Sequence, residues 1–523
     1  MVPDPRNVYR PIAIIGLHGR MPGAVDLAGF WDNLVHGRDA VALVPGERWS
    51  WEEIFGEPAE GEDRTYANRG GFMPFVDRFD CRFFNILPRE AQTMDPQQRL
   101  FLQTAWAAFE DAGHAPSSLA GRKVGVFVGT GYADYPVLMR RDHVPLDIYR
   151  ATGMAQTAIA NRVSYTFDFH GPSESIDTAC SSSLVAIHRA VQSLHRGECE
   201  MALAGGVNLL LGPELFIAFA KAGMLSRSGQ CRTFDAAADG YVRGEGVGAL
   251  VLCPLEDAER RGDFIYGVIR GSAENHGGHA HSFTAPNATA QADVVSEAWR
   301  CAGISPARAA LIETHGTGTP LGDPIEINGL KKALDDAPDY AARGTIALGA
   351  LKSHIGHLEA AAGIAGVIRT LLALRHKILP ANLHRHRLNP YIDFDGAPFV
   401  MPSQNLPLTA TVFADGEPAA LLAGVSSFGF GGVNAHVVLQ SHDRPAPSPS
   451  EANAPSHAYL VVLSAKDAPG LRARVSQMIG FLDDADAQAR RALETTVLRD
   501  LYAALCVAPP IAPAPQSTPL TSL

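Results

Sequence analysis

With 523 residues, the chain has room for two to four domains or for one large double domain with appendages, and its 46% of hydrophobic residues can fill a large core. A formal net charge of −11 argues against nucleic-acid binding, which needs a net basic surface. No apolar run reaches membrane-spanning length, and seven scattered cysteines without a C-x-x-C pair indicate neither a disulfide framework nor a zinc cage. We therefore expect a soluble, cytoplasmic protein.

Short apolar runs alternate with helical patterns over the first 440 residues. Residues 11–16 and 123–129 are apolar runs that end in glycine, as buried strands do. The spacing of apolar residues over 89–112 predicts a single helix. This alternation is typical of an α/β fold with central sheets covered by helices.

The segment around Cys180 has the pattern of a strand end, a sharp turn and a helix start. From Leu184 onward, apolar residues recur at helical spacing. Free N–H groups and the helix dipole at this position favour a thiolate, and the turn is similar to a nucleophile elbow. The alternative is a buried structural cysteine before a Ser-capped helix, which would be favoured if Cys180 stood alone.

His315 begins a glycine-rich loop at a predicted strand end. Residues 311–314 have strand character, and a helix is predicted from about 325 to 334. Active sites of α/β proteins gather on such loops. Thr317 and Thr319 place two hydroxyls beside the histidine.

The start of that helix also fits a capping signature. Asp323 suits the N-cap, Pro324 the first turn, and Glu326 the third position of a capping box. A cap does not require a histidine upstream, so His315 needs another explanation.

A second strand is predicted over 345–351 and runs into a segment from Lys352 to His357, followed by a helix rich in small residues. One histidine at such a junction is usually a core residue. Two histidines on similar strand–loop–helix units, together with the Cys180 turn, form a constellation. A thiolate can accept an acyl group, two donors can stabilise the enolate left by decarboxylation, and N–H groups can hold an oxyanion.

These motifs carry a family resemblance. Residues 176–183, 315–319 and 352–357 resemble the three signatures of the β-ketoacyl synthases of polyketide assembly lines. The resemblance implies a thiolase-like α/β fold of two similar halves in five layers, αβαβα, working as a homodimer. It also implies transfer of an acyl chain from an acyl carrier protein to the cysteine, then decarboxylative Claisen condensation with malonyl-carrier protein to a β-ketoacyl product. The expected divisions are an N-terminal half at 8–262, a C-terminal half at 263–440, a linker at 441–457, a partial adaptor at 458–507 and a Pro-rich tail at 508–523, expected to be disordered.

By position, the resemblance assigns the catalytic roles. Cys180 would accept the acyl chain, while His315 and His357 would bind the malonyl thioester and drive decarboxylation. Lys352 would be the active-site lysine, ion-paired to Glu326.

The resemblance also places binding groups. Thr317 and Thr319 would contact the phosphopantetheine arm. Residues 427–432 match the gate of the family, where the N–H of Phe430 would join that of Cys180 in an oxyanion hole.

Two positions depart from the family pattern. His354 and Met154 stand where asparagine is usual or frequent, and we expect both near the pocket, where they would affect substrate preference. Segments 95–100, 160–165 and 205–211 resemble the trans-acyltransferase branch.

The partners follow from what the chain lacks. We expect no cofactor bound by this chain, because the phosphopantetheine arm comes with the acyl carrier protein. No G-x-S-x-G elbow occurs, so malonyl loading is expected from a separate acyltransferase. The sequence looks like one excised domain or the end of a subunit.

Three further signals have plainer explanations. His276, His279 and His281 lack ligand spacing on a regular element, so we expect no metal. The glycines of 244–248 lead into a strand-like run, which argues against a nucleotide loop. The basic residues of 384–387 predict a solvated face by default, with carrier docking as the sharper hypothesis.

Three alternatives stay open. A non-elongating ketosynthase that passes acyl chains between carriers would be expected to have lost His315, which is present. A fatty-acid elongation synthase would lack the insert at 48–66 and the adaptor-like tail. A non-catalytic dimerisation subunit is disfavoured by Cys180.

Overall fold

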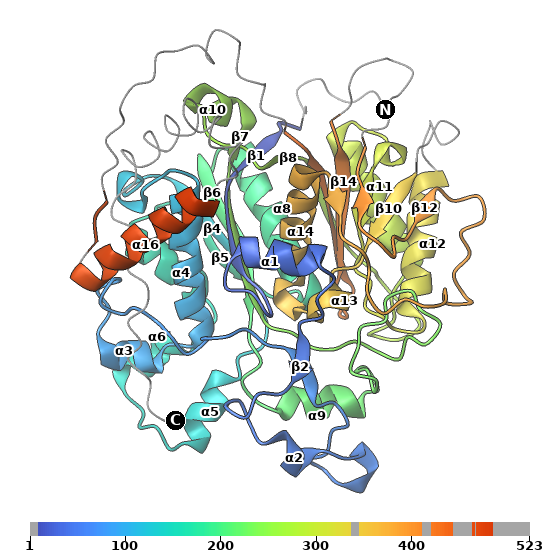
Figure 1. Cartoon of the computed structure of the whole chain (residues 1–523), viewed down its shortest axis with the longest axis horizontal. Helices are drawn as coiled ribbons and strands as arrows, with labels where there is room; N and C mark the ends of the chain where they lie inside the picture. The colour runs from blue at the N-terminus through green and yellow to red at the C-terminus, as the bar shows by residue number, and fades with distance from the viewer. Residues whose placement is uncertain (1–8, 336–344, 410–419, 443–462, 466, 485–523) are drawn as a thin grey trace.

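The computed structural model describes residues 9–335, 345–409, 420–442, 463–465 and 467–484. Its core is a mixed sheet of eleven strands (Figure 1). The five strands on one side are β1 (Ile12–Arg20), β7 (Gly246–Pro254), β6 (Met201–Asn208), β4 (Val124–Gly129) and β5 (Ser173–Ile176), in that order. The other side contains β8 (Gly267–His276), β15 (Val433–Gln440), β14 (Leu422–Phe428), β9 (Leu311–Glu313), β10 (Ile346–Gly349) and the short edge strand β12 (Phe399–Val400).

The two sides repeat one pairing pattern. Counted outward from the middle of the sheet, the first two pairs of neighbouring strands on each side are antiparallel and the next two are parallel. Strands β1 and β8 pair antiparallel and join the sides. The chain therefore consists of two similar halves, and β5 corresponds to β10.

Helices complete five layers. Between the two half-sheets lie α8 (Ser182–His195) and α14 (Ala362–His376) (Figure 1). Side chains on nearly all sides of α14 are buried. A Cβ on Gly363 would come within 2.8 Å of the Leu184 Cβ, so the small residue lets the two helices meet. Helices α4 (Pro96–Asp111) and α7 (Ala158–Phe167) cover one outer face, and α11 (Ala288–Ala302) and α12 (Gly322–Asp335) cover the other. The expected αβαβα arrangement is confirmed.

The helix predicted over 89–112 is in fact two helices. Helix α3 (Pro88–Thr93) ends before Met94, whose backbone is extended, and α4 begins at Pro96. Proline suits a first helical turn because it has no N–H to leave unpaired. The Asp95 carboxylate caps the new helix by accepting from the Gln97 N–H at 2.8 Å.

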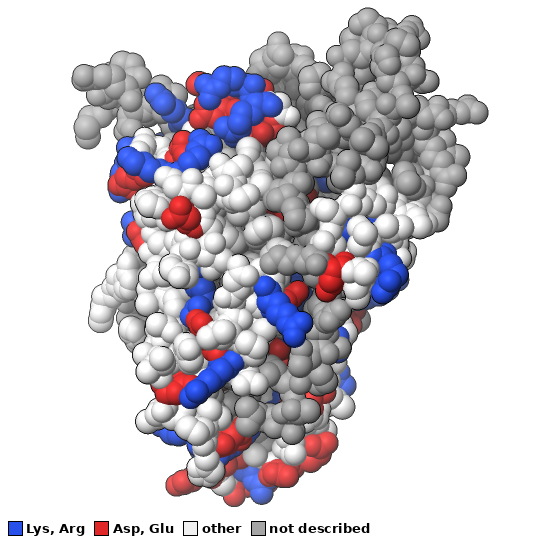
Figure 2. All heavy atoms as spheres, turned by 90° about the vertical axis from the view of Figure 1, so that its left-hand side faces the viewer, with Lys and Arg blue, Asp and Glu red and all other residues white. Residues whose placement is uncertain are grey.

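The expected C-terminal helix is present as α16 (Ala468–Asp484), which lies beside α4 in Figure 1. Most of the strand predicted at 459–463, nearly all of the linker and the whole of the tail lie outside the described residues. On the face that Figure 2 shows, Lys and Arg are interspersed with Asp and Glu, so neither sign dominates there.

The remaining elements are short and connect or border the layers. They are α1 (Leu27–Val35), β2 (Val41–Leu43), α2 (Trp51–Ile54), β3 (Arg69–Gly71), α5 (Tyr135–Arg141), α6 (Ile148–Gly153), α9 (Glu214–Lys221), α10 (Leu255–Arg261), α13 (Lys352–Ile355), β11 (Ile378–Leu379) and β13 (Leu406–Pro407). In the part of the chain that the structure describes, no helix is both long and apolar enough to cross a bilayer.

Candidate active site

Cys180 lies on a tight turn between β5 and α8. Ala179 before it has φ 57°, a left-handed conformation that costs a non-glycine residue about 1 kcal/mol. The neighbouring strand β4 leaves room for the turn because it has a glycine there. A Cβ on Gly129 would lie 2.3 Å from the Ser183 nitrogen, which is too close for any side chain. The strained turn presents the thiol at the start of the central helix, as the sequence predicted.

The thiol opens into a cavity of about 840 Å³. Cys180, His315 and His357 all line it, and their ligand atoms lie within 4.8 Å of one another. Three residues far apart in the chain therefore converge on one space, which is large enough for an extended ligand.

His315 is held through its own peptide groups. The Glu326 carboxylate accepts from the N–H of His315 at 2.7 Å and from that of Gly316 at 2.8 Å. The Lys352 ammonium donates to the His315 carbonyl oxygen. Lys352 and Glu326 attract each other electrostatically and bind the same loop, although the ion pairs of the described residues include no direct contact between them. Glu326 does not act as a capping-box residue.

Asp323 also differs from its prediction. It lies inside the first turn of α12, and its carboxylate accepts from the N–H groups of Phe234 at 2.7 Å and Gly318 at 3.0 Å. Burial raises its pKa to about 6. Instead of capping a helix, Asp323 fixes the loop that follows His315.

The protonation of His357 follows from its contacts. Its Nδ1 accepts from the Glu359 N–H at 2.9 Å, so the proton of the neutral ring is on Nε2. Nε2 has no hydrogen-bond partner among the described residues. Burial first, and the Lys352 charge second, lower the pKa of both His315 and His357 well below its ordinary value, so both rings stay neutral.

Cys180, His315 and His357 are also the one set with metal-ligand spacing that the described residues contain. A histidine nitrogen that carries a proton cannot ligate a metal, and the Glu359 N–H keeps the proton of His357 on the cavity side. The set therefore suits hydrogen-bond donation better than metal binding.

The electrostatics of Cys180 differ from the expectation. Burial, followed by the negative charge of Glu359, raises the pKa of Cys180 to about 11. The N–H groups of Phe430 and of Cys180 itself act in the opposite direction. Burial outweighs these two N–H groups and the positive charge of Lys352, which also lowers the pKa, so the resting group is a thiol with two N–H donors facing its sulfur.

The other predicted residues divide into two groups. Thr317 and Thr319 line the cavity, and their hydroxyls are 3.0 Å apart. Met154 and His354 are absent from the cavity lining. The Met154 sulfur faces Arg150 at 3.7 Å, and His354 is buried on α13 beside Ser353.

Sequence reasoning missed three residues near the site. Tyr241 lines the cavity, with its ring 5.2 Å from that of His357. Arg243 and Glu359 form a buried ion pair behind the same histidine. In the sequence, only the glycines next to Arg243 stood in a recognisable pattern, which was considered as a nucleotide loop. They lead into strand β7 and not into a helix, so they do not form a nucleotide loop.

Comparisons with known proteins agree with this geometry. The family model "Beta-ketoacyl synthase, N-terminal domain" matches residues 9–258, the C-terminal domain model matches 266–386, and the model of the ketoacyl-synthetase C-terminal extension matches 389–498. Polyketide synthase PksN of Bacillus subtilis is 47% identical over 481 residues, and ThaG of Burkholderia thailandensis is 49% identical over 464. These alignments cover 90% and 88% of the chain but only 9% and 8% of the two relatives.

Solved structures show the same likeness. The oxazolomycin ketosynthase domain OzmH KS7, from a Streptomyces albus strain, superposes with a TM-score of 0.87 at 41% identity, covering 95% of this chain and 85% of that one. The ketosynthase from module 6 of the bacillaene synthase of Bacillus subtilis gives a TM-score of 0.81 at 37% identity, covering 96% of this chain and 81% of that one. The chain therefore belongs to the β-ketoacyl synthase family, in the polyketide synthase group. Enzymes of this group are acyltransferases that catalyse condensation, act on acyl carrier proteins and use no cofactor of their own.

Proposed function

We propose that this chain joins an acyl group, held on Cys180, to a malonyl unit delivered by an acyl carrier protein. The observation that supports the proposal is the meeting of the Cys180 thiol and two neutral imidazoles at one cavity. The trans-acyltransferase relatives favour a polyketide substrate over a fatty acid.

In the first half-reaction, Cys180 sulfur attacks the carbonyl of an acyl thioester on the carrier arm. The N–H groups of Cys180 and Phe430 stabilise the tetrahedral oxyanion. The carbon–sulfur bond to the arm then breaks, the proton of Cys180 passes to the departing sulfur, and the arm leaves as a free thiol.

In the second half-reaction, the malonyl thioester loses CO₂ and becomes an enolate. The Nε2–H of His357 and the ring of His315 stabilise the thioester oxygen on which the charge collects. The enolate carbon attacks the acyl group, a carbon–carbon bond forms, and Cys180 leaves and regains a proton. Thr317 and Thr319 bind the arm along the cavity wall.

Dimerisation is the second part of the proposal. Strand β5 lies at the free end of the sheet, directly before the Cys180 turn. Tyr165 on α7 is 86% exposed, and the apolar Leu146 and Ile148 are also largely exposed. Two such edges can pair and cover this apolar surface, giving a homodimer.

The acyl carrier protein docks, in this proposal, near the basic segment 384–387. The N–H groups of His386 and Arg387 bind Asp235, and Asn389 donates to the carbonyl of Pro320 on the cavity wall. Arg387 is exposed, whereas Arg385 is half-buried and donates to Met401, so Arg387 is the better placed to meet an acidic partner. No acyltransferase motif lies within these 523 residues, and in this proposal an acyltransferase outside them loads the malonyl unit.

Two variants test the chemistry. Cys180→Ala should abolish covalent loading from an acyl thioester, observed by intact mass. His315→Ala should still be loaded but should lose most decarboxylation of a malonyl thioester, by about a hundredfold or more, because the enolate loses a stabilising group. If His315→Ala decarboxylates at nearly the wild-type rate, the assigned role is wrong.

A further inference from the structure

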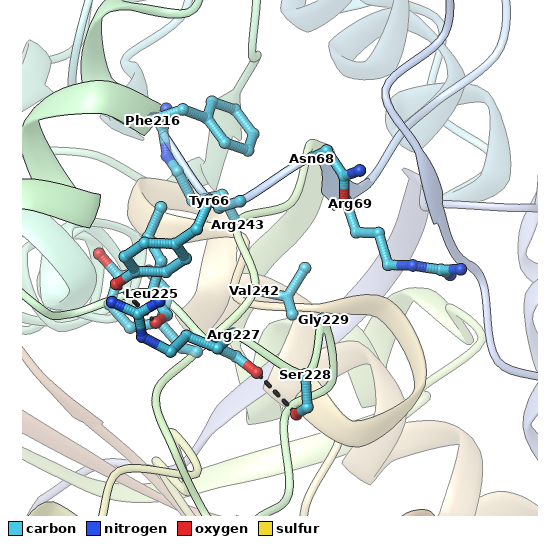
Figure 3. A pocket seen from close by; sticks show the side chains of 13 residues that line it. Tyr66, Asn68, Arg69, Phe216, Leu225, Arg227, Ser228, Gly229, Val242 and Arg243 are labelled. Atoms are coloured by element: carbon cyan, nitrogen blue, oxygen red, sulfur yellow. Dashed lines mark hydrogen bonds between the residues drawn. The ribbon is translucent and has the colours of Figure 1, made fainter. Parts of the chain in front are cut away.

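A buried ion pair lies behind the reactive groups. The guanidinium of Arg243 binds the Glu359 carboxylate with hydrogen bonds of 2.5 and 3.0 Å. Arg243 is 1% exposed and packs over the ring of Phe216, and both residues line a small pocket of about 60 Å³ (Figure 3). Charges so well shielded from water act strongly on their neighbours.

The backbones of both residues hold His357. Arg243 pairs with His357 in a β-bridge, and the Glu359 N–H donates to its Nδ1. Glu359 has φ 48°, a left-handed conformation that is unusual for glutamate. The ion pair anchors the side chain of this strained residue, which keeps its N–H directed at the imidazole.

The same carboxylate is near the nucleophile. The turn Glu359–Ala361 packs on the turn Ala179–Ser181, which carries Cys180. After burial, Glu359 is the largest cause that raises the pKa of Cys180. The ionisable groups that face the thiol are Glu359, Lys352, His315, His357, Tyr132 and Tyr241.

We propose that Arg243 and Glu359 are positioning residues: Arg243 anchors Glu359, and Glu359 fixes His357 as an Nε2–H donor and places behind Cys180 a negative charge that the guanidinium of Arg243 partly offsets. Each partner alone would bias the thiol in the opposite direction to the other. This inference rests on the proposed function of Cys180 and His357.

The opposite signs give a sharp test. Glu359→Gln leaves a buried cation, so the pH midpoint of Cys180 alkylation by iodoacetamide should fall by about one unit. Arg243→Gln leaves a buried anion, so the midpoint should rise by a similar amount. The double variant should return toward the wild type, and Glu359→Asp, which keeps the charge, should stay close to it. The readout is the mass of the peptide that contains Cys180, because other cysteines are partly exposed.

Glu245→Gln is the matched control. Glu245 is also buried and pairs with an arginine, Arg48, at 3.2 Å, but its carboxylate binds the N–H groups of Met73 and Leu210. This variant should leave the alkylation midpoint unchanged. Thermal unfolding shows whether each variant is folded.

A second readout separates positioning from general damage. Both single variants should lose decarboxylation of a malonyl thioester by about tenfold or more while Cys180 is still acylated. Midpoints that move in the same direction, or do not move, would overturn the inference. Alkylation needs only the thiol, so it reports on the ion pair even if acyl loading fails and the proposed function is wrong. If acyl loading occurs but the alkylation midpoints of the two variants do not move in opposite directions, this inference alone is wrong.

Discussion

At the scale of single residues, Glu326 links the site to pH. Burial raises its pKa to about 7, and the ionised carboxylate accepts from the N–H groups of His315 and Gly316. A protonated carboxyl offers one acceptor fewer to this loop. Because the pKa is raised, the proton is taken up as the pH falls through about 7, well above the range of an ordinary glutamate.

Decarboxylation should therefore decline as the pH falls below about 7, while the histidines, with their lowered pKa, add no titration of their own there. Glu326→Gln should be slow and nearly independent of pH over the same range, since its amide accepts from only one of the two N–H groups. Initial rates of CO₂ release between about pH 5.5 and 8.5 would show this. A wild-type profile that is flat across pH 7 would contradict the role given to Glu326.

Residue types that carry chemistry could be recognised from the sequence, but their partners could not. Cys180, His315 and His357 stand in distinctive motifs and converge as predicted. Glu326 has a spacing that fits a helix cap equally well, and only the fold shows that its carboxylate turns back to the preceding loop. The Arg243–Glu359 pair joins positions 116 residues apart, and no local pattern indicates it.

At the scale of elements, the gate turn between β14 and β15 fits closely over the Cys180 turn. A Cβ on Gly429 would lie 2.5 Å from the Thr178 carbonyl oxygen and 3.1 Å from the Ser181 hydroxyl. A Cβ on Gly431 would meet only the tip of the Phe283 ring, at 3.9 Å. Gly431 thus has room for an added methyl group, whereas Gly429 does not.

Gly429→Ala should push the Phe430 N–H away from the sulfur and slow acylation by about tenfold or more, because one oxyanion donor is misplaced. Gly431→Ala should load at close to the wild-type rate. Loading from an acyl thioester, followed by mass over time, distinguishes them. Equal rates for the two variants would show that the gate turn does not position the donor.

Element boundaries were predictable where a single period dominates. The strand before His315 begins with two apolar residues, and the strand end before Cys180 precedes a recognisable turn; both strands are present, as β9 and β5. The break between α3 and α4 was missed because the apolar spacing continues across it, although Pro96 and the capping Asp95 mark the new start.

At the scale of the whole molecule, duplication explains why the site lies where it does. The Cys180 turn follows β5, and the segment with Lys352 and His357 follows the corresponding strand β10. In both halves a turn with one left-handed residue, Ala179 or Glu359, leads into a central helix. The two turns pack together, so one half supplies the nucleophile and the other supplies donors. The motifs predicted each strand–turn–helix unit separately. The equivalence of the two units could not be predicted, because it depends on pairing between strands that are distant in the chain.

The proposed dimer makes its own prediction at this scale. Tyr165 lies on α7, which packs on β5, and 86% of it is exposed in the single chain. Tyr165→Glu should shift the chain toward a monomer by at least about tenfold in dissociation constant, because pairing of the two edges would bury the new charges in an apolar contact. Tyr391→Glu is the matched control, since Tyr391 is 71% exposed but belongs to the C-terminal half. Sedimentation over a range of concentrations measures the dissociation constants of both variants.

A wild-type chain that sediments as a monomer would remove the dimer proposal, and a Tyr165→Glu variant that stays as dimeric as the control would move the interface elsewhere. Because β5 runs into the Cys180 turn, a monomeric variant should also load acyl groups more slowly than the control.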